Sequence, residues 1–115
     1  ISFPFPLSDK TRRILAHAQR EAGRLLHPAV QPEHLLLGII RQGDCFAALL
    51  IHLYVPDDES LIHEVETVLP PGNLENIPFD IPYSERTQAF LKKTEATRRR
   101  LHHDEIRSDH LLLAM

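Results

Sequence analysis

The sequence contains one motif of an acid, a histidine and three leucines twice, with His34 and His110 at equivalent positions 76 residues apart. The match extends upstream without a gap. Identical residues recur at the same spacing: Ser8, Thr11, Leu15, Arg24, Leu25 and His27 return as Ser84, Thr87, Leu91, Arg100, Leu101 and His103. Self-similarity at a fixed spacing indicates a structural unit that is used more than once. The chain is therefore predicted to contain two copies of one unit.

The spacing of apolar residues predicts that the unit is helical. Between Ser8 and about Leu26, apolar residues recur at steps of three and four, which gives one apolar helix face. Ser8 is suited to the N-cap of this helix and Asp9 to its first turn, while His27-Pro28 is expected to end it. Three more helices are expected: Pro32–Arg41, Cys45–Tyr54 with Asp44 as its cap, and one from Pro56-Asp57-Asp58 to Leu69 with Leu61, Ile62, Val65, Val68 and Leu69 facing inward.

The second copy is shorter than the first. Residues 70–82 hold four prolines and are predicted to form an ordered connector, with no β-sheet. A helix capped by Ser84 and a helix from Ser108 then repeat the first two helices. We expect one all-α domain over 1–115 with pseudo-twofold symmetry, a first repeat at 8–69 and a partial second repeat at 83–115, truncated after its second helix. Leucines exposed by this truncation would favour self-association.

Charge and hydropathy argue against two classes of partner. The net charge is −3, so no overall field attracts nucleic acid or acidic lipid. The apolar runs at Leu35–Ile40 and Phe46–Val55 are too short to cross a bilayer. Arg98-Arg99-Arg100 is interpreted as a solvated helix face. A single cysteine, Cys45, excludes an internal disulfide and fits a reducing compartment, so a cytoplasmic location is expected.

The sequence carries no recognised catalytic motif. There are four glycines, none of them in a phosphate-binding loop, and no G-x-S-x-G sequence. Cys45 belongs to an apolar segment, where thiols are usually inert. We therefore predict that the domain is not an enzyme and needs no cofactor.

Eight histidines raise the alternative of a metal-binding protein. They include no H-E-x-x-H sequence and no Cys/His quartet. His27 and His103 are equivalent, as are His34 and His110, which favours a repeated structural role: a ring near a helix end, hydrogen-bonded to the backbone. No metal site is predicted, and elemental analysis of the purified protein would decide the alternative.

The doubled pattern resembles the Clp N-terminal domain, the repeated four-helix unit at the front of the ClpA/ClpC/ClpB class of AAA+ unfoldases. The residues that carry the resemblance are Ser8-x-x-Thr11, Leu15, His27 and Pro32-Glu33-His34-Leu35-Leu36-Leu37-Gly38, together with the equivalent residues of the second copy. The resemblance implies a domain without ATPase activity that receives adaptors and unfolded or tagged client proteins for a Clp ATPase or protease ring. An alternative within the family is a standalone accessory subunit that stabilises a Clp protease complex.

In the ClpC-like branch, the resemblance implies a phosphoarginine pocket in each repeat. The family's hydroxyl residue falls on Ser8 and Ser84, and its acid falls on Glu33 and Asp109. The family's Thr-Glu-His is Pro32-Glu33-His34 here, which removes a hydroxyl and an N–H group. The alternative is that the serines only cap helices and the acids only complement helix dipoles. Phe79 and Tyr83 are expected as exposed apolar contacts at the periphery of the partner surface.

Overall fold

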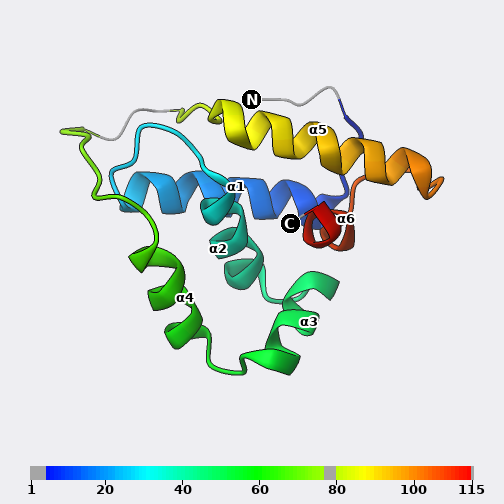
Figure 1. The fold of residues 1–115 in the computed structure, drawn as a ribbon, viewed down its shortest axis with the longest axis horizontal. Helices are drawn as coiled ribbons and strands as arrows, with labels where there is room; N and C mark the ends of the chain where they lie inside the picture. The colour runs from blue at the N-terminus through cyan, green and yellow to red at the C-terminus, as the bar shows by residue number, and fades with distance from the viewer. Residues whose placement is uncertain (1–4, 77–79, 115) are drawn as a thin grey trace.

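The computed structural model describes residues 5–76 and 80–114. Their helices are α1 (Asp9–Arg24), α2 (Pro32–Gln42), α3 (Phe46–Tyr54), α4 (Asp58–Thr67), α5 (Glu85–Arg100) and α6 (Ser108–Ala114). The described residues contain no strand, which confirms the predicted all-α class. Helices α1 and α5 run in opposite directions across Figure 1, with α2 and α6 packed against them.

Helix α1 forms as its sequence pattern predicts. Ile14, Leu15, Ala18 and Ala22 lie on one face and are buried in the core. The Ser8 hydroxyl caps the helix by accepting a hydrogen bond from the Thr11 amide at 3.1 Å. The helical segment ends at Arg24, three residues before His27, so the predicted end at His27-Pro28 is too late.

The backbone explains this early end. Leu26 adopts a left-handed conformation with φ 60°, and the amides of Leu26 and His27 donate to Gly23 and Ala22 carbonyls. This is a Schellman closure, which satisfies the last carbonyls of a helix. A Schellman closure normally has glycine at the left-handed position, and because Leu26 stands there instead, no glycine indicated this helix end. His102, with φ 57°, occupies the same conformation after α5.

The two repeats exchange equivalent contacts. The segment before α1 pairs in parallel with the loop before α6 (Leu7 with Ile106), and the segment before α5 pairs with the loop before α2 (Tyr83 with Val30). The backbone hydrogen bonds are also duplicated: Ser8 N to Ile106 O at 2.9 Å, and Ser84 N to Val30 O at 3.1 Å. These reciprocal contacts confirm the pseudo-twofold arrangement of a duplicated unit.

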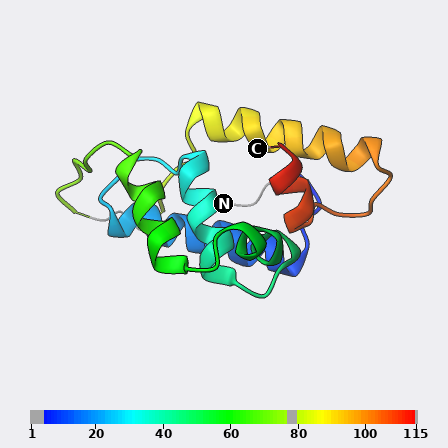
Figure 2. The ribbon, with the colours of Figure 1, turned by 60° about the horizontal axis from the view of Figure 1, so that its bottom comes forward.

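Helices α3 and α4 belong to the first repeat and have no counterpart among the described residues. Helix α3 packs on α6 and α2, and α4 packs on α2 (Figure 2). Cys45, without a side-chain cap bond, occupies the N-cap of α3, so the prediction of Asp44 as its cap is wrong. The expected inward face of α4 is also wrong in part: Val65 is buried, but Val68 is 72% exposed because the helix ends at Thr67.

Helix α3 is more exposed than its composition indicated. Ala47 and Ala48 are buried, whereas four large apolar side chains face outward: Phe46, Leu49, Leu53 and Tyr54. On α6, Leu111 is buried and Leu113 is 65% exposed. In the described part of the chain, no single helix has the length and apolarity to cross a membrane; α2 and α3 meet that test only as a pair bent by 93°.

Candidate functional site

The structure pairs the expected site residues across the two repeats. Because each cap segment lies on the loop of the other repeat, Ser8 stands beside the start of α6, and Ser84 stands beside the start of α2. The serine of one repeat therefore shares a site with the acid of the other: Ser8 with Asp109, and Ser84 with Glu33. This grouping differs from the expected one, which placed a pocket within each repeat; that either pair binds a ligand stays a prediction.

Ser8 and Asp109 line an open cleft of about 630 Å³. Its other lining residues are Asp9, Lys10, Phe46, Glu105, Arg107 and Ser108. The Asp109 carboxylate accepts a hydrogen bond from Arg107 Nη2 at 3.0 Å, and Lys10 Nζ donates to the Asp44 carbonyl at 2.6 Å. The 55% exposed ring of Phe46 adds an apolar wall. The cleft thus offers carboxylates, cationic groups and an aromatic surface to one ligand segment.

At the second site, the charged and hydroxyl side chains pair with neighbouring side chains. Arg86, the counterpart of Lys10, forms an ion pair with Glu33. The Ser84 hydroxyl donates to Gln31 Oε1 at 3.0 Å. Gln31 occupies the position of Arg107 in the other repeat, so the two sites carry different charges. The duplicated sequence therefore produces one open cleft and one internally paired counterpart.

Tyr83 does not form the exposed peripheral contact that we expected of it. Tyr83 is only 8% exposed because it lies in the bridge with Val30, and burial, with a further contribution from Asp80, raises the pKa of its hydroxyl to about 12. Phe79 lies outside the described residues. Phe46, on α3, supplies the exposed aromatic side chain of the cleft.

Two histidines form a directional hydrogen-bond relay behind the second site. The Gln31 amide donates to His34 Nδ1 at 2.8 Å, so the proton of the neutral ring is on Nε2. His34 Nε2 donates to His27 Nδ1 at 2.8 Å, and His27 Nε2 then donates to the Pro70 carbonyl at 2.7 Å. The relay joins the start of α2, the end of α1 and the connector, which confirms the predicted structural role of these rings.

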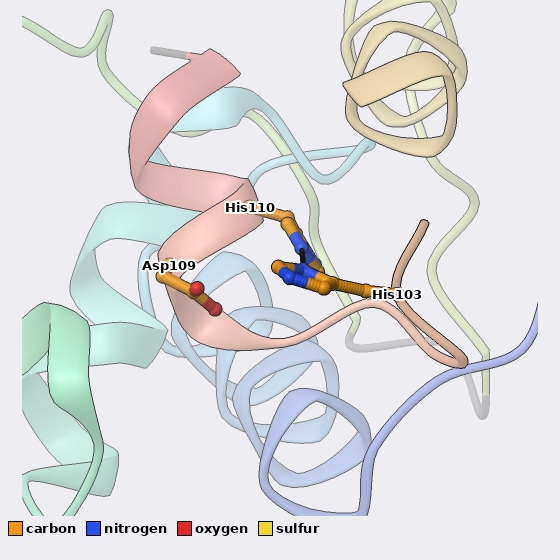
Figure 3. Close-up of side chains that lie close together, drawn as sticks. All are labelled: His103, Asp109 and His110. Carbon is orange, nitrogen blue, oxygen red and sulfur yellow. Dashed lines mark hydrogen bonds between the residues drawn. The ribbon is translucent and has the colours of Figure 1, made fainter. Parts of the chain in front are cut away.

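The other repeat has the same pair. The Arg107 amide donates to His110 Nδ1 at 2.9 Å, and His110 Nε2 donates to His103 Nδ1 at 2.6 Å. Figure 3 shows these two rings together with Asp109, which precedes His110 on α6. One atom from each of these three side chains lies within 4.8 Å of the others, a spacing that could hold a metal ion.

The donor set does not favour a metal at this place. Both nitrogens of His110 are already used, one by an amide proton and one by the bond to His103. The Arg107 guanidinium donates to both Asp109 and His103 Nδ1, so a cation already occupies the centre of the group. A metal ion would have to displace this guanidinium and break the bond between the rings. We therefore assign the group to structure.

Acid should weaken the fold through the buried relay. Burial, with the neighbouring His27 as a smaller cause, lowers the pKa of His34 from 6.5 to about 4. The unfolded state therefore binds the proton first as the pH falls. The contribution of the neutral His34 ring to the stability of the fold is complete above pH 6.5 and is lost progressively toward about pH 4. Between pH 7 and pH 4.5, protonation of this ring alone should lower the free energy of unfolding by roughly 2 kcal/mol, measured by urea denaturation. An NMR titration that finds His34 protonated near pH 6.5 would contradict this prediction.

Two buried glutamates fix the basic residues around them. Glu21, 6% exposed, pairs with Arg24 and Arg41 and links α1 to α2. Glu95 is equally buried and pairs with Arg98, which also donates to the His103 carbonyl at 2.9 Å. Arg98 is therefore not part of a solvated basic face, contrary to our expectation for Arg98-Arg99-Arg100. A phosphate-binding surface there would lack one of its three cations.

Lys10, Phe46 and Arg107 line the cleft but were absent from the predicted site. The pairing of Lys10 with Arg86 in the duplicated sequence was a usable signal, because it places a cation two residues after each capping serine. Phe46 carried no such signal. Its equivalent position lies beyond the 115 residues of this sequence, and its exposure depends on how α3 packs against α6.

Comparisons with known proteins agree with this architecture. The family model for the Clp repeat (R) N-terminal domain matches residues 6–115. The ATP-dependent Clp protease ATP-binding subunits ClpC of Staphylococcus saprophyticus and Staphylococcus aureus are each 31% identical over 109 residues, which is 95% of this chain. The chain spans only 13% of the length of these relatives.

Solved structures show the same fold. The N-terminal domain of the ClpV1 ATPase from Escherichia coli EAEC superposes with a TM-score of 0.77 at 25% identity, over 95% of this chain and 66% of that one. The N-terminal domain of ClpD from Arabidopsis thaliana superposes with a TM-score of 0.76 at 18% identity, over 98% of this chain and 77% of that one.

Proposed function

Because this chain belongs to the Clp repeat N-terminal domain family, we propose that it is a non-catalytic module that binds adaptor or client proteins for a Clp ATPase or protease ring. The observation that carries the proposal is the open cleft between the repeats, lined by Ser8, Phe46 and Asp109. The proposal includes two further points: the domain serves a Clp ATPase or protease ring, and it acts in the cytoplasm.

The chemistry of the cleft suits a segment of unfolded polypeptide. Glu105 and Asp109 can pair with basic side chains, and the ring of Phe46 can pack on apolar ones. Lys10 and the Ser8 hydroxyl, at the start of α1, also line the cleft and can receive an anionic group, including the phosphate of a phosphoarginine. Exposed contacts of this kind give modest, reversible binding, which a recruiting domain requires.

A cleft variant tests the proposal. Phe46→Ala should weaken binding of a carboxymethylated, permanently unfolded test protein about tenfold, because exposed aromatic anchors often contribute more than 1 kcal/mol to an interface. Tyr54→Ala is the matched control, since Tyr54 is an 87% exposed aromatic residue on the same helix and does not line the cleft. Isothermal titration calorimetry measures both. Equal losses in the two variants would show that binding follows general surface apolarity and that the cleft is not the site.

A phosphoarginine peptide provides a second arm of this measurement. If the cleft recognises phosphate, this peptide should bind more tightly than its arginine counterpart, and Lys10→Gln should remove the difference. Arg86→Gln at the internally paired site should leave it unchanged, because Glu33 and Arg86 neutralise each other there. Equal affinities for the two peptides would limit the proposal to unmodified polypeptide.

A further inference from the structure

The outer face of α1 carries arginines that have no partner in the described part of the chain. Arg12, Arg13 and Arg20 are exposed, and among the described residues none of their side chains forms an ion pair or a hydrogen bond. Arg13 and Arg20 are seven residues apart, so they lie on one side of the helix, about 10 Å apart along its axis. The acids of this helix lie elsewhere: Asp9 is in the first turn and Glu21 is buried.

The fold does not need Arg13 and Arg20. The equivalent positions on α5, 76 residues later, are Ala89 and Ala96, and both of these alanines are exposed. The same helical unit therefore forms with uncharged side chains at these two places. Two cations on a face that could be neutral, in a chain whose net charge is −3, indicate a role outside the packing of the unit.

Helix α4 has the opposite character, because it contains four acids and no lysine or arginine. Two of the acids are paired within the chain, one with His52 and one with Arg24. The other two, Glu59 and Glu64, are exposed, and their side chains form no bond among the described residues. The exposed N-cap residue Asp57 precedes Glu64 by seven residues, which is the spacing of the two arginines on α1.

The basic face of α1 and the acidic face of α4 do not meet within one chain. Helix α4 lies beside the C-terminal end of α1 (Figure 1), where Arg24 pairs with Glu66. The other polar contact from this part of the first repeat, Lys10 with the Asp44 carbonyl, is at the start of α1. The 76-residue spacing places the corresponding segments of the second repeat at the two ends of α5. The outer face of α1 is therefore not a surface that the second repeat would cover.

We propose that the outer face of α1, at Arg13 and Arg20, binds the acidic face of α4, at Asp57, Glu59 and Glu64, on a second copy of this chain. Charge complementarity and the shared seven-residue spacing select this occupant. The net charge of −3 opposes the approach of a long polyanion such as nucleic acid. Because the two faces differ, the contact is heterologous, and each copy can bind a neighbour through either face. This association is separate from the proposed client function and uses none of the residues that line the cleft.

Sedimentation equilibrium of the 115-residue chain and two charge-reversed variants tests the proposal. At about 20 mM salt, where charges interact over about 20 Å, the average mass should rise above 13.2 kDa as the protein concentration increases. Arg13→Glu/Arg20→Glu and Glu59→Lys/Glu64→Lys should each weaken the association at least about tenfold, because either reversal makes the two faces repel each other. All four side chains are exposed, so neither reversal disturbs the core.

A mixture of the two variants distinguishes this contact from any other. Each variant alone has two faces of the same sign, whereas the mixture restores complementary pairs and should associate as the unaltered chain does. Lys92→Glu/Lys93→Glu is the matched control, because it makes the same change of charge at exposed positions of α5. Association of this control should persist.

Three results would overturn the proposal: a chain that stays monomeric at millimolar concentration in about 20 mM salt, variants that associate as strongly as the unaltered chain, or a mixture that stays monomeric. The second result would assign association to apolar surface such as the exposed Leu113. A monomeric chain that binds nucleic acid, and loses this binding in Arg13→Glu/Arg20→Glu, would assign the face to a polyanion. None of these results bears on the cleft, which the unfolded test protein probes.

Discussion

Gly38→Ala should destabilise the protein by about 3 kcal/mol, although alanine is the better helix former by about 1 kcal/mol. Gly38 lies where α2 crosses α1, and a Cβ atom there would be 2.4 Å from the Ile14 carbonyl oxygen and 3.2 Å from the Ala18 amide nitrogen. The obstacle is backbone of a neighbouring helix, so it cannot move aside as a flexible side chain could. Urea denaturation followed by circular dichroism measures the change in the free energy of unfolding.

The second repeat offers the control for Gly38. Its equivalent residue is Ala114, which is 6% exposed, so the contact between α5 and α6 accommodates a methyl group. Ala114→Gly should cost only about 1 kcal/mol, the usual loss of helix propensity. A Gly38→Ala variant as stable as the unaltered protein would show that α1 and α2 do not pack as closely as we describe.

His34→Leu should cost about 3 kcal/mol, because leucine fills the space but makes none of the polar contacts. The His34 ring is fully buried and accepts from the Gln31 amide while it donates to His27. Its loss leaves the amide without its partner and cuts the relay that ends at the Pro70 carbonyl. The effect should be visible as a lower urea midpoint at pH 7.

His110→Leu is the matched variant, and its cost should be smaller, about 2 kcal/mol. His110 is also fully buried, but among the described residues its relay ends at the half-buried His103 ring, without the bond to a connector that His27 makes. The His34→Leu variant should also lose the part of the stability change between pH 7 and pH 4.5 that protonation of the His34 ring contributes. Equal costs for the two variants would contradict a role for the first relay in fastening the connector.

The duplication and the helix faces could be predicted from the sequence because they depend on local patterns. Ser8 and Ser84 cap helices, and Ile14 and Leu15 point into the core, as their spacing indicated. The equivalent histidines were also interpreted correctly as structural. The hydrogen bonds between the paired rings, His27 with His34 and His103 with His110, were not predicted. They depend on the shape of the loop between the two histidines of each pair.

Which residues come together in the cleft could not be predicted from the sequence, because this depends on how the two repeats pack against each other. The sequence places Ser8 and Glu33 in one repeat, yet Ser8 shares a cleft with Asp109. The crossed bridges at Leu7 and Val30 produce this exchange, and pairing between distant segments has no local signal. The same holds for α3, whose apolar sequence indicated burial although Phe46 and Tyr54 are exposed.

Chemical-shift mapping with an unfolded protein tests the central claim most directly. The isotope-labelled chain would be titrated with the carboxymethylated test protein, and the shifted amides placed on the structure. We predict that they cluster around the cleft between the repeats, at Ser8, Phe46, Arg107 and Asp109. A titration without shifts, or with shifts confined to α4, would contradict the claim that this domain binds proteins through that cleft.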